Sequence, residues 1–490
     1  MNLKAIRLRN FRGFRDASIE LKPLTVLLGP NSAGKSAFGH ALAAMAHAQS
    51  EYKDTGRATL SPRDNKAAEN WPIDFGQHAD LCTKGVADRV HIDLKTREGW
   101  FEFGFGGLES VTGLVLSYIK HPLGRHDSFP VQTSLNEPIL SPEGAVSGAS
   151  AITPLQIETS GSEIELIRRK EQYWHDEKEQ SVRVGLNGLL VDTVSHETGT
   201  TILLDSMARL DVKDLLEHVT YLRASRKRPC RGYERRTSND GSLIGYAGEW
   251  TASLLMDSLS NQVVKDPVTF RYPSSIPNSV AEAQKLIDVP WKQRHENLLD
   301  AAGTWLQHLG LAGAIETRVS PRDSTRIEVR VTMNQSWGAR DITEIGYGIS
   351  QVLPVLVGGL LQPEKGLFIV DLPEAHLHPK PQAELADFFC SLALSGRPCL
   401  VETHSEMFFH RLRLRAAMNK DLMGKIAVYF CDPPQPDGDG ACSNPRKIGL
   451  DLGEDLQWPV DFFQEAWEME TQISAVREAR RVAADDQTSA

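Results

Sequence analysis

The chain has 490 residues, of which 41% are hydrophobic and 24% charged, and its formal net charge at pH 7 is −10. These values are typical of a globular protein with two or three structural units, and they exclude a strongly basic nucleic-acid coat protein. The six cysteines form no C-x-x-C pair, residues 1–10 lack the apolar core of a signal peptide, and the most apolar stretch, residues 349–370, is interrupted by proline, glycine and charge. We therefore expect a cytoplasmic protein without a zinc site or a membrane-spanning helix.

Three short strands are predicted at the start of the chain. Residues 4–11 and 17–21 flank a turn that contains Arg12, and residues 24–28 form a continuous apolar run. Such a run is typical of a buried parallel strand. Residues 37–48 are rich in alanine and contain no proline, which predicts a helix.

Between the third strand and this helix, Gly29–Ser36 matches the G-x-x-x-x-G-K-[ST] pattern of a phosphate-binding loop. Its glycines let successive N–H groups point at phosphate oxygens, and the start of the helix adds the positive end of its dipole. Lys35 would reach the β- and γ-phosphates, and the Ser36 hydroxyl would hold Mg²⁺. A loop that merely connects strand and helix is the alternative, which the full motif in its context disfavours. The predicted nucleotide contacts of the loop are Gly29, Asn31, Ser32, Ala33, Gly34, Lys35 and Ser36.

The middle of the chain changes character at about residue 205. Before it, strand-length pieces follow residues 90–94 and 100–105 as far as residue 204. After it, Leu215, Val219 and Leu222 fall at the i, i+4, i+7 spacing of a helix face. We predict a mostly helical subdomain over residues 205–340, with a strand at 327–332 and no long coiled coil, since heptads are absent.

Residues 223–236 form the most basic segment of the chain, with seven arginines or lysines in fourteen residues. The segment could contact phosphates of DNA or RNA, or a partner bound to nucleic acid. It could also approach the nucleotide or be a solvated loop, and the pattern leaves these alternatives open. The residues concerned are Arg223, Arg226, Lys227, Arg228, Arg231, Arg235 and Arg236.

The last third of the chain alternates apolar strands and helices. We predict helices at 346–361, 381–394 and 462–483, strands at 367–371 and 398–404, and a hairpin of residues 425–430 with 446–450. Asp371 ends the first of these strands and fits a carboxylate that orders the Mg²⁺ shell. Glu374 could activate or orient water, and His404 could sense the γ-phosphate. Each residue alone has a structural alternative, but their order after the loop favours a site for ATP and Mg²⁺.

Five segments carry a resemblance that covers both ends of the chain. They are Leu8–Phe14, Gly29–Ser36, Gly346–Pro354, Asp371–Pro379 and Glu402–Ser405, and they resemble the motifs of ABC-type ATPase heads in the RecF/SMC/OLD-like branch. Trp458–Phe463 resembles a C-terminal module of a bacterial AAA-type subgroup of that branch, whereas residues 106–340 match only loosely.

The resemblance implies an α/β fold, a two-lobed ABC-type P-loop ATPase head with an inserted, mostly helical subdomain. The implied parts are an N-terminal lobe over residues 1–204, the insertion over 205–340 and a C-terminal lobe over 341–490. It also implies a site split between two protomers, in which the glycine turn of a facing protomer caps the γ-phosphate. The further nucleotide contacts that it implies are Arg12, the Q-loop residue Gln77, Gly346, Gly348, Ser350 and Gln351.

One position departs from the pattern of the family. ABC-type heads usually carry a second carboxylate after the strand-terminal aspartate, where it is the catalytic base, but this chain has Leu372. Leucine cannot polarise water. Either Glu374 takes this role, or the protein works mainly as an ATP-gated clamp, and we favour slow hydrolysis assisted by Glu374.

Two other patterns have a structural interpretation. His376 and His378 have no third metal ligand beside them in the sequence, which disfavours a metal site. Residues 437–440 resemble the D-x-D of a Toprim nuclease, but their polar, glycine-rich setting is typical of a hairpin loop. Nuclease activity in this chain is therefore not expected.

The expected output is nucleotide-gated dimerisation, in which ATP brings two heads together and hydrolysis parts them. By analogy with the branch, the heads would regulate an effector protein, such as a nuclease or toxin, or engage DNA, in bacterial anti-phage defence or genome maintenance. The alternatives are a DNA-stimulated ATPase of DNA repair and an ATP-dependent nuclease in one chain. A homodimer or higher homo-oligomer is expected, and no membrane partner.

Overall fold

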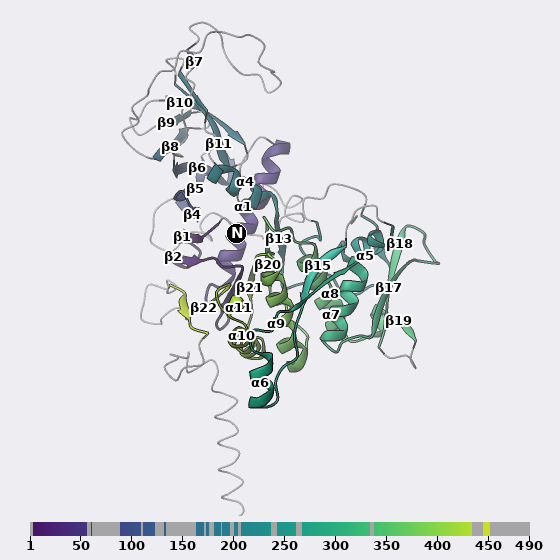
Figure 1. Cartoon of the computed structure of the whole chain (residues 1–490). Coiled ribbons are helices and arrows are strands. Elements are labelled where there is room, and N and C mark those ends of the chain that lie inside the picture. The colour runs from purple at the N-terminus through teal and green to yellow at the C-terminus, as the bar shows by residue number, and fades with distance from the viewer. Residues whose placement is uncertain are drawn as a thin grey trace, which may run out of the picture.

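A computed structural model gives the architecture of the chain (Figure 1). It describes residues 3–55, 60, 89–108 and 111–122, the strand segments between 132 and 203, and residues 207–236, 243–260, 267–333, 338–433 and 444–450. Gln77, residues 437–440, the predicted helix at 462–483 and Trp458–Phe463 lie outside the described residues.

A six-stranded sheet forms the centre of the molecule, in the order β13-β20-β21-β3-β22-β23. The first five strands are parallel and β23 is antiparallel to β22. Their bounds are Val219–Leu222 (β13), Leu367–Asp371 (β20), Cys399–Glu402 (β21), Leu24–Leu28 (β3), Ile426–Phe430 (β22) and Arg446–Ile448 (β23). The predicted strands at 24–28, 367–371 and 398–404 and the predicted hairpin are therefore confirmed.

Alternate residues of these strands enter two separate hydrophobic cores, because side chains of a strand point to opposite faces. In β20, Phe368 and Val370 join one core, and Leu367 and Ile369 join the other. The first core contains residues of α7 (Leu298–His308), α8 (Tyr347–Leu361) and α9 (Pro379–Leu394), and the second contains residues of α1 (Ser36–Thr55). The central sheet is thus buried on both faces, as its continuous apolar strands require.

An eleven-stranded antiparallel sheet shares the second core with α1 (Figure 1). Its order is β2-β1-β4-β5-β6-β8-β9-β10-β11-β12-β7. Its strands are Ala5–Phe11 (β1), Phe14–Glu20 (β2), Arg89–Lys95 (β4), Trp100–Leu108 (β5), Val111–Pro122 (β6), Gln132–Thr133 (β7), Glu163–Lys170 (β8), Tyr173–His175 (β9), Ser181–Asn187 (β10), Leu190–His196 (β11) and Thr200–Leu203 (β12).

The prediction of a mostly helical structure over residues 205–340 is wrong, since the described part of this segment mixes helices and strands. Its helices are Met207–Glu217 (α4), Thr251–Ser260 (α5), Val280–Leu286 (α6) and α7. Besides β13, its strands are Tyr233–Glu234 (β14), Val268–Tyr272 (β15), Lys292–Glu296 (β16), Ala314–Val319 (β17), Arg326–Thr332 (β18) and Ala339–Asp341 (β19). The predicted strand at 327–332 is confirmed as β18.

The largest difference concerns Val219–Leu222, which forms strand β13 rather than a turn of helix. It pairs in parallel with β20, so it belongs to the central sheet and not to an inserted subdomain. The β-branched and aromatic side chains of this segment favour a strand once a neighbouring strand offers its edge. The domain boundaries themselves stay a prediction.

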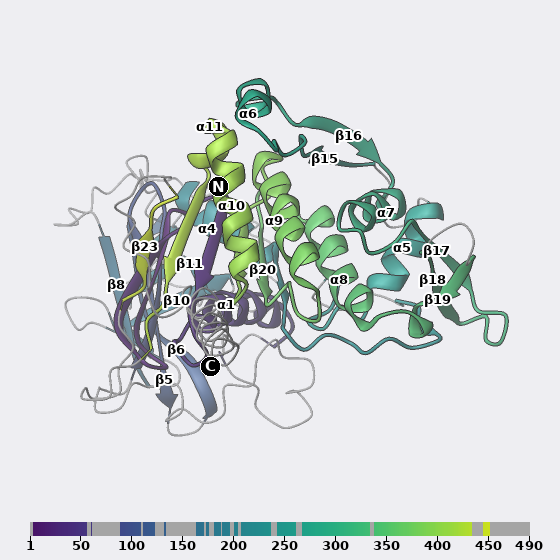
Figure 2. The same cartoon turned by 90° about the horizontal axis from the view of Figure 1, so that it is seen from below.

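The C-terminal helices α9, α10 (Glu406–Met418) and α11 (Lys420–Met423) lie beside the central sheet, and α7 and α8 lie next to α9 (Figure 2). A short 3-10 helix, Ile342–Glu344, precedes α8. No helix in the described part of the chain is long and apolar enough to cross a membrane.

A buried ion network around Asp387 connects these helices. The fully buried Asp387 of α9 accepts hydrogen bonds from Arg411 and Arg415 of α10 and lies 2.9 Å from His308 Nε2 of α7. Arg415 also donates to the carbonyl of Ser274, which follows β15, over 2.8 Å. Burial alone would raise the pKa of Asp387, but these donors lower it well below its ordinary value.

We expect Asp387→Asn to destabilise the protein strongly, because it leaves two buried guanidinium groups facing a neutral amide. Breaking a buried ion network typically costs about 3–5 kcal/mol. The measurement is the free energy of unfolding in urea. Asp214→Asn is the matched control, since Asp214 pairs with Lys365 while their side chains are 39% and 76% exposed, and its loss should cost less than about 1 kcal/mol. Equal effects of the two substitutions would contradict the assignment.

Candidate nucleotide site

The loop between β3 and α1 has the backbone conformation that its glycines predict. Gly29 and Gly34 have φ values of +142° and +81°, and Ser32 also has a positive φ of 64°. A Cβ atom at Gly29 would lie 2.3 Å from the carbonyl oxygen of Cys431, so no side chain fits there. The loop therefore needs glycine at position 29 for both its conformation and its packing.

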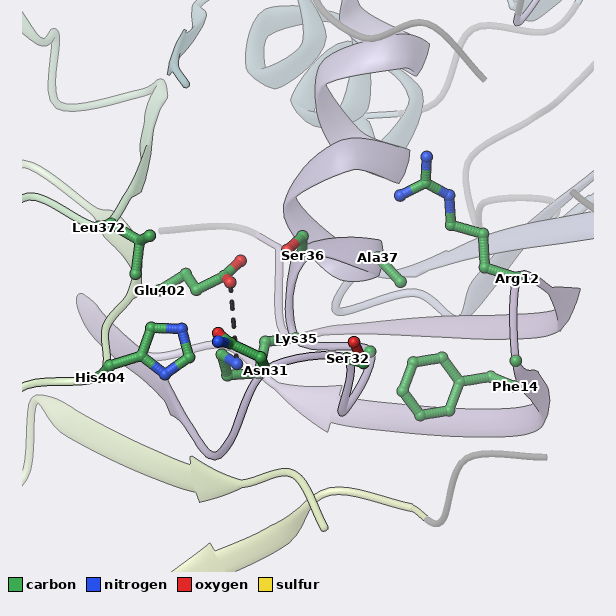
Figure 3. Close-up of a pocket in the computed structure, with 12 residues that line it drawn as sticks. Arg12, Phe14, Asn31, Ser32, Lys35, Ser36, Ala37, Leu372, Glu402 and His404 are labelled. Atoms are coloured by element: carbon green, nitrogen blue, oxygen red, sulfur yellow. Dashed lines mark ion pairs between the residues drawn. The ribbon is translucent and has the colours of Figure 1, made fainter. Parts of the chain in front are cut away.

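A pocket of about 510 Å³ opens beside this loop (Figure 3). Lys35 is only 3% exposed, and its ammonium donates a hydrogen bond of 2.6 Å to the carbonyl of Pro30 and lies 4.0 Å from Glu402 Oε1. Burial lowers the pKa of Lys35, while the Glu402 carboxylate opposes this shift. The residues that line the pocket are Arg12, Gly13, Phe14, Asn31, Ser32, Gly34, Lys35, Ser36, Ala37, Leu372, Glu402 and His404.

Two carboxylates end neighbouring strands on the face of the sheet that α1 covers. Asp371 is the register partner of Glu402, and each continues the row of apolar residues that enters the second core. Asp371 Oδ2 accepts a hydrogen bond of 2.6 Å from the Tyr221 hydroxyl of β13 and lies 3.5 Å from His40 Nε2 of α1. Both carboxylates thus face the helix that begins with Ser36.

Glu402 is a charged residue of this site for which the sequence predicted no role. The period-2 alternation of Cys399–Glu402 places it on the same face as Leu400, and this signal was available in the sequence. The side chain is buried beside the Ser36 hydroxyl and Lys35. Burial and the neighbouring Asp371 raise the pKa of Glu402 to about 7.

Glu374 and His404 lie together, but only His404 lines the pocket. Glu374 Oε1 accepts a hydrogen bond of 2.8 Å from the backbone N–H of His404, and Glu374 is not among the residues that line the pocket. The His404 side chain does line it. Burial lowers the pKa of His404, Lys35 acts in the same direction, and the Gly29 carbonyl opposes the shift.

Leu372 has a left-handed backbone, with a φ of 45°, which is strained for a branched residue. The Arg226 guanidinium supports this turn by donating to the carbonyls of Asp371 and Leu372 over 2.7 and 3.1 Å. The Leu372 N–H donates to the carbonyl of Glu402 over 2.8 Å. These bonds fix the turn that follows the Asp371 strand.

Arg226 is therefore a structural residue, contrary to the predicted contact with nucleic acid or a partner. It is only 4% exposed, so its charge cannot reach a ligand at the surface. Three other arginines of the basic segment face carboxylates: Arg223 lies 3.7 Å from Glu249, Arg231 3.4 Å from Glu344, and Arg235 3.8 Å from Asp257. The Arg236 side chain donates to the carbonyl of Leu243, Lys227 lies over the ring of Tyr233, and Arg228 is exposed.

The predicted signature segment lies outside the pocket of its own chain. Gly346 and Tyr347 are exposed at the start of α8, and the Tyr347 ring packs edge-on against His376, with ring centroids 4.8 Å apart. Ser350 donates to the Tyr347 carbonyl, and Gln351 is 2% exposed. Only the first residues of α8 are therefore available to a facing molecule.

Arg12 lines the pocket from the turn between β1 and β2 (Figure 3). Its Nη1 lies 2.7 Å from His40 Nδ1, and burial lowers the pKa of its guanidinium. Since His40 also approaches Asp371, a chain of polar contacts runs from Arg12 to that carboxylate.

The donor atoms at this site fit Mg²⁺. The Ser36 hydroxyl and the Asp371 carboxylate are hard oxygen donors, which this ion prefers. Among the described residues, no group of three or more His, Cys, Asp or Glu side chains forms a metal centre. An ion here would therefore be held by few protein oxygens together with phosphate oxygens, as is usual for Mg²⁺ at nucleotide sites.

Two family models match separate parts of the chain. One, described as an AAA ATPase domain, matches residues 1–98. The other, described as an AAA domain, putative AbiEii toxin of a type IV toxin–antitoxin system, matches residues 270–409. The first match includes the phosphate-binding loop, and the second includes α8, Asp371 and His404. Comparison with curated proteins gave no match.

Solved structures of SMC heads are similar to the chain at a low level. An SMC head bound to the C-terminal winged-helix domain of ScpA has a TM-score of 0.39 and 10% identity, and covers 92% of this chain and 99% of its own. The SMC head domain of Thermotoga maritima has a TM-score of 0.32 and 10% identity, and covers 92% and 100%. An SMC head with an extended coiled coil, bound to the C-terminal domain of ScpA derived from Pyrococcus furiosus, has a TM-score of 0.37 and 10% identity, and covers 96% and 99%.

We expect Arg226→Met to lower ATP turnover at least about tenfold, because each lost bond from a charged donor is worth about 1.5–3 kcal/mol and the strained turn at Leu372 loses its support. The methionine keeps the length of the side chain. Arg228→Met, at an exposed position of the same segment, is the control and should leave turnover within about twofold. The measurement is steady-state phosphate release. A larger effect at position 228 than at 226 would contradict the structural role.

Proposed function

Because the chain is an ABC/SMC-like P-loop ATPase of the RecF/SMC/OLD type, we propose that two copies close over ATP and Mg²⁺ and that slow hydrolysis separates them. In this proposal Lys35 and the loop N–H groups bind the phosphates, and Ser36 and Asp371 order the Mg²⁺ shell. His404 contacts the γ-phosphate, and Arg12 contacts the nucleotide from the opposite side of the pocket. Mg²⁺, when bound, neutralises phosphate charge during transfer.

The proposal of a dimer is supported by the distance, within one chain, between the nucleotide pocket and the start of α8. Lys35, Asp371, Glu402 and His404 meet at one edge of the central sheet, whereas Gly346 and Tyr347 are exposed and line no part of that pocket. A helix start with free N–H groups binds anions well. A second copy would bring this helix start to the open side of the nucleotide.

The contacts of Glu374 change its proposed role. Its carboxylate holds the backbone of His404, so we assign it to positioning of the His404 turn rather than to the activation of water.

We further propose that the output of this cycle is a protein partner. The basic segment favours this choice over direct binding of DNA, because Arg226 is buried and Arg223, Arg231 and Arg235 face carboxylates. The family description that names a toxin system is consistent with a regulated effector, such as a toxin or nuclease, in bacterial defence. This last step is an analogy with the family.

Lys35→Ala tests the nucleotide site. It should abolish Mg-ATP binding and lower turnover by about 100-fold or more, since it removes the cation that faces the transferring phosphoryl group. Lys420→Ala, whose side chain is 89% exposed, should behave like the wild type. The measurements are calorimetric ATP binding and phosphate release. Unchanged turnover in Lys35→Ala would refute the proposed function.

Mixed dimers test the composite site. A Cβ atom at Gly346 would meet nothing within 4 Å, so Gly346→Arg should fold while blocking the approach of a facing nucleotide. Gly346→Arg alone and Lys35→Ala alone should both be inactive. An equal mixture should regain turnover, because a mixed dimer holds one site with both an intact loop and an intact helix start. Absence of recovery in a mixture that forms mixed dimers would exclude the composite site.

DNA stimulation separates the two kinds of output. A protein-regulating ATPase should show turnover that duplex DNA does not change. A DNA-engaging ATPase should be stimulated, with a strong loss of stimulation as salt rises. Charge reversal at the exposed Arg228 should then weaken stimulation, and Arg228→Glu is the variant that measures it.

A further inference from the structure

Glu402 is the single carboxylate among the described residues that line the nucleotide pocket. It ends β21, the strand that lies between the β20 strand of Asp371 and the β3 strand that leads into the phosphate-binding loop. Its side chain is 10% exposed and turns toward α1, where Oε1 lies 4.0 Å from Lys35 Nζ (Figure 3). Its other oxygen, Oε2, is buried and accepts no hydrogen bond from the part of the chain that the structure describes.

A buried carboxylate oxygen without a donor is costly, so it requires an explanation. The strands β3, β20 and β21 end at one edge of the sheet, beside the phosphate-binding loop. A water molecule bound at this edge can be the missing donor. A water molecule next to the γ-phosphate would donate to Oε2, while Lys35 and Ser36 lie beside the same side chain. The position thus combines rigidity, from a strand end, with a buried acceptor that has no donor among the described residues.

The other candidate acceptors near the pocket are engaged elsewhere. Asp371 accepts a hydrogen bond from Tyr221 and lies beside His40. Glu374 has one buried oxygen without a partner, but its other oxygen binds the His404 backbone and the residue does not line the pocket. Leu372 lines the pocket with an apolar side chain.

We propose that Glu402 is the proton acceptor for the attacking water in ATP hydrolysis by this chain. The oxygen of the water forms a bond to the γ-phosphorus as its O–H bond breaks and the proton passes to Glu402 Oε2. The bond between the γ-phosphorus and the β–γ bridging oxygen breaks, and ADP leaves with the electron pair. The carboxylate of Glu402 therefore takes the role for which position 372 offers only leucine.

The inference rests on the proposed function, since it concerns the same nucleotide site, but its test is separate. Glu402→Gln keeps the shape of the side chain and removes its basicity. We expect single-turnover hydrolysis to fall by about 100-fold or more, as is typical for loss of a general base, while the affinity for Mg-ATP changes less than about threefold. Glu406→Gln, four residues further along the chain at the start of α10, is the matched control and should hydrolyse ATP like the wild type.

Two further variants make the assignment specific. Glu374→Gln should weaken the hold on the His404 backbone and raise the KM for ATP more than it lowers kcat. Leu372→Glu in the Glu402→Gln background should recover hydrolysis, because it returns a carboxylate to the pocket from the neighbouring strand end. Thermal unfolding of each variant monitors the fold.

Near-wild-type hydrolysis in Glu402→Gln would overturn the inference, and so would a loss of ATP affinity large enough to account for the whole loss of turnover. In either case the proposed function would stand as long as Lys35→Ala is inactive. Intact turnover in Lys35→Ala would instead refute the proposed function itself, whatever the result at Glu402.

Discussion

The parallel pairing of β20, β21 and β3 is the constraint on which the site depends. Parallel strands in register end at one edge of the sheet, so residues far apart in sequence meet there. The register pairs Asp371 with Glu402, and Glu402 with Leu27. Leu27 is the second-last residue of β3, the strand that leads into the loop. A shift of one residue in β21 would turn Glu402 to the opposite face, away from Lys35, and would bury its charge in the first core. The two apolar cores that fix this register are therefore also what aligns the carboxylates.

A second constraint is the strained turn at Leu372. A leucine in the left-handed region costs roughly 1–2 kcal/mol, and such residues persist where the surroundings over-determine them. Here Arg226 donates two hydrogen bonds to the turn, and the β21 backbone accepts a third from it. Arg226 follows the end of β13 by four residues, so the short edge strand, whose spacing also fits a helix, brings this arginine to the turn. The structural role of Arg226 thus depends on β13 being a strand of the central sheet.

Sequence patterns predicted those elements whose own residues fit a single kind of structure. β3 and β20 are continuous apolar runs, and the loop between β3 and α1 has a full motif, so each is identified without knowledge of the rest. Val219–Leu222 fits both helical spacing and a short strand, and only pairing with β20 decides between them. The burial of Arg226 depends on a contact across 145 residues of sequence, which no local pattern contains. Glu402 lies between these cases, because alternation in β21 shows its face but only the fold shows that Lys35 is there.

The Asp387 network connects the helix that follows the site to elements far from it. Helix α10 begins at Glu406, capped by the Ser405 side chain, directly after His404. Its Arg411 and Arg415 bind the buried Asp387, and through it His308 of α7, while Arg415 also holds the segment after β15. Charged hydrogen bonds, which cannot slide as apolar contacts can, therefore join helix α10 to α9, to α7 and to the segment after β15.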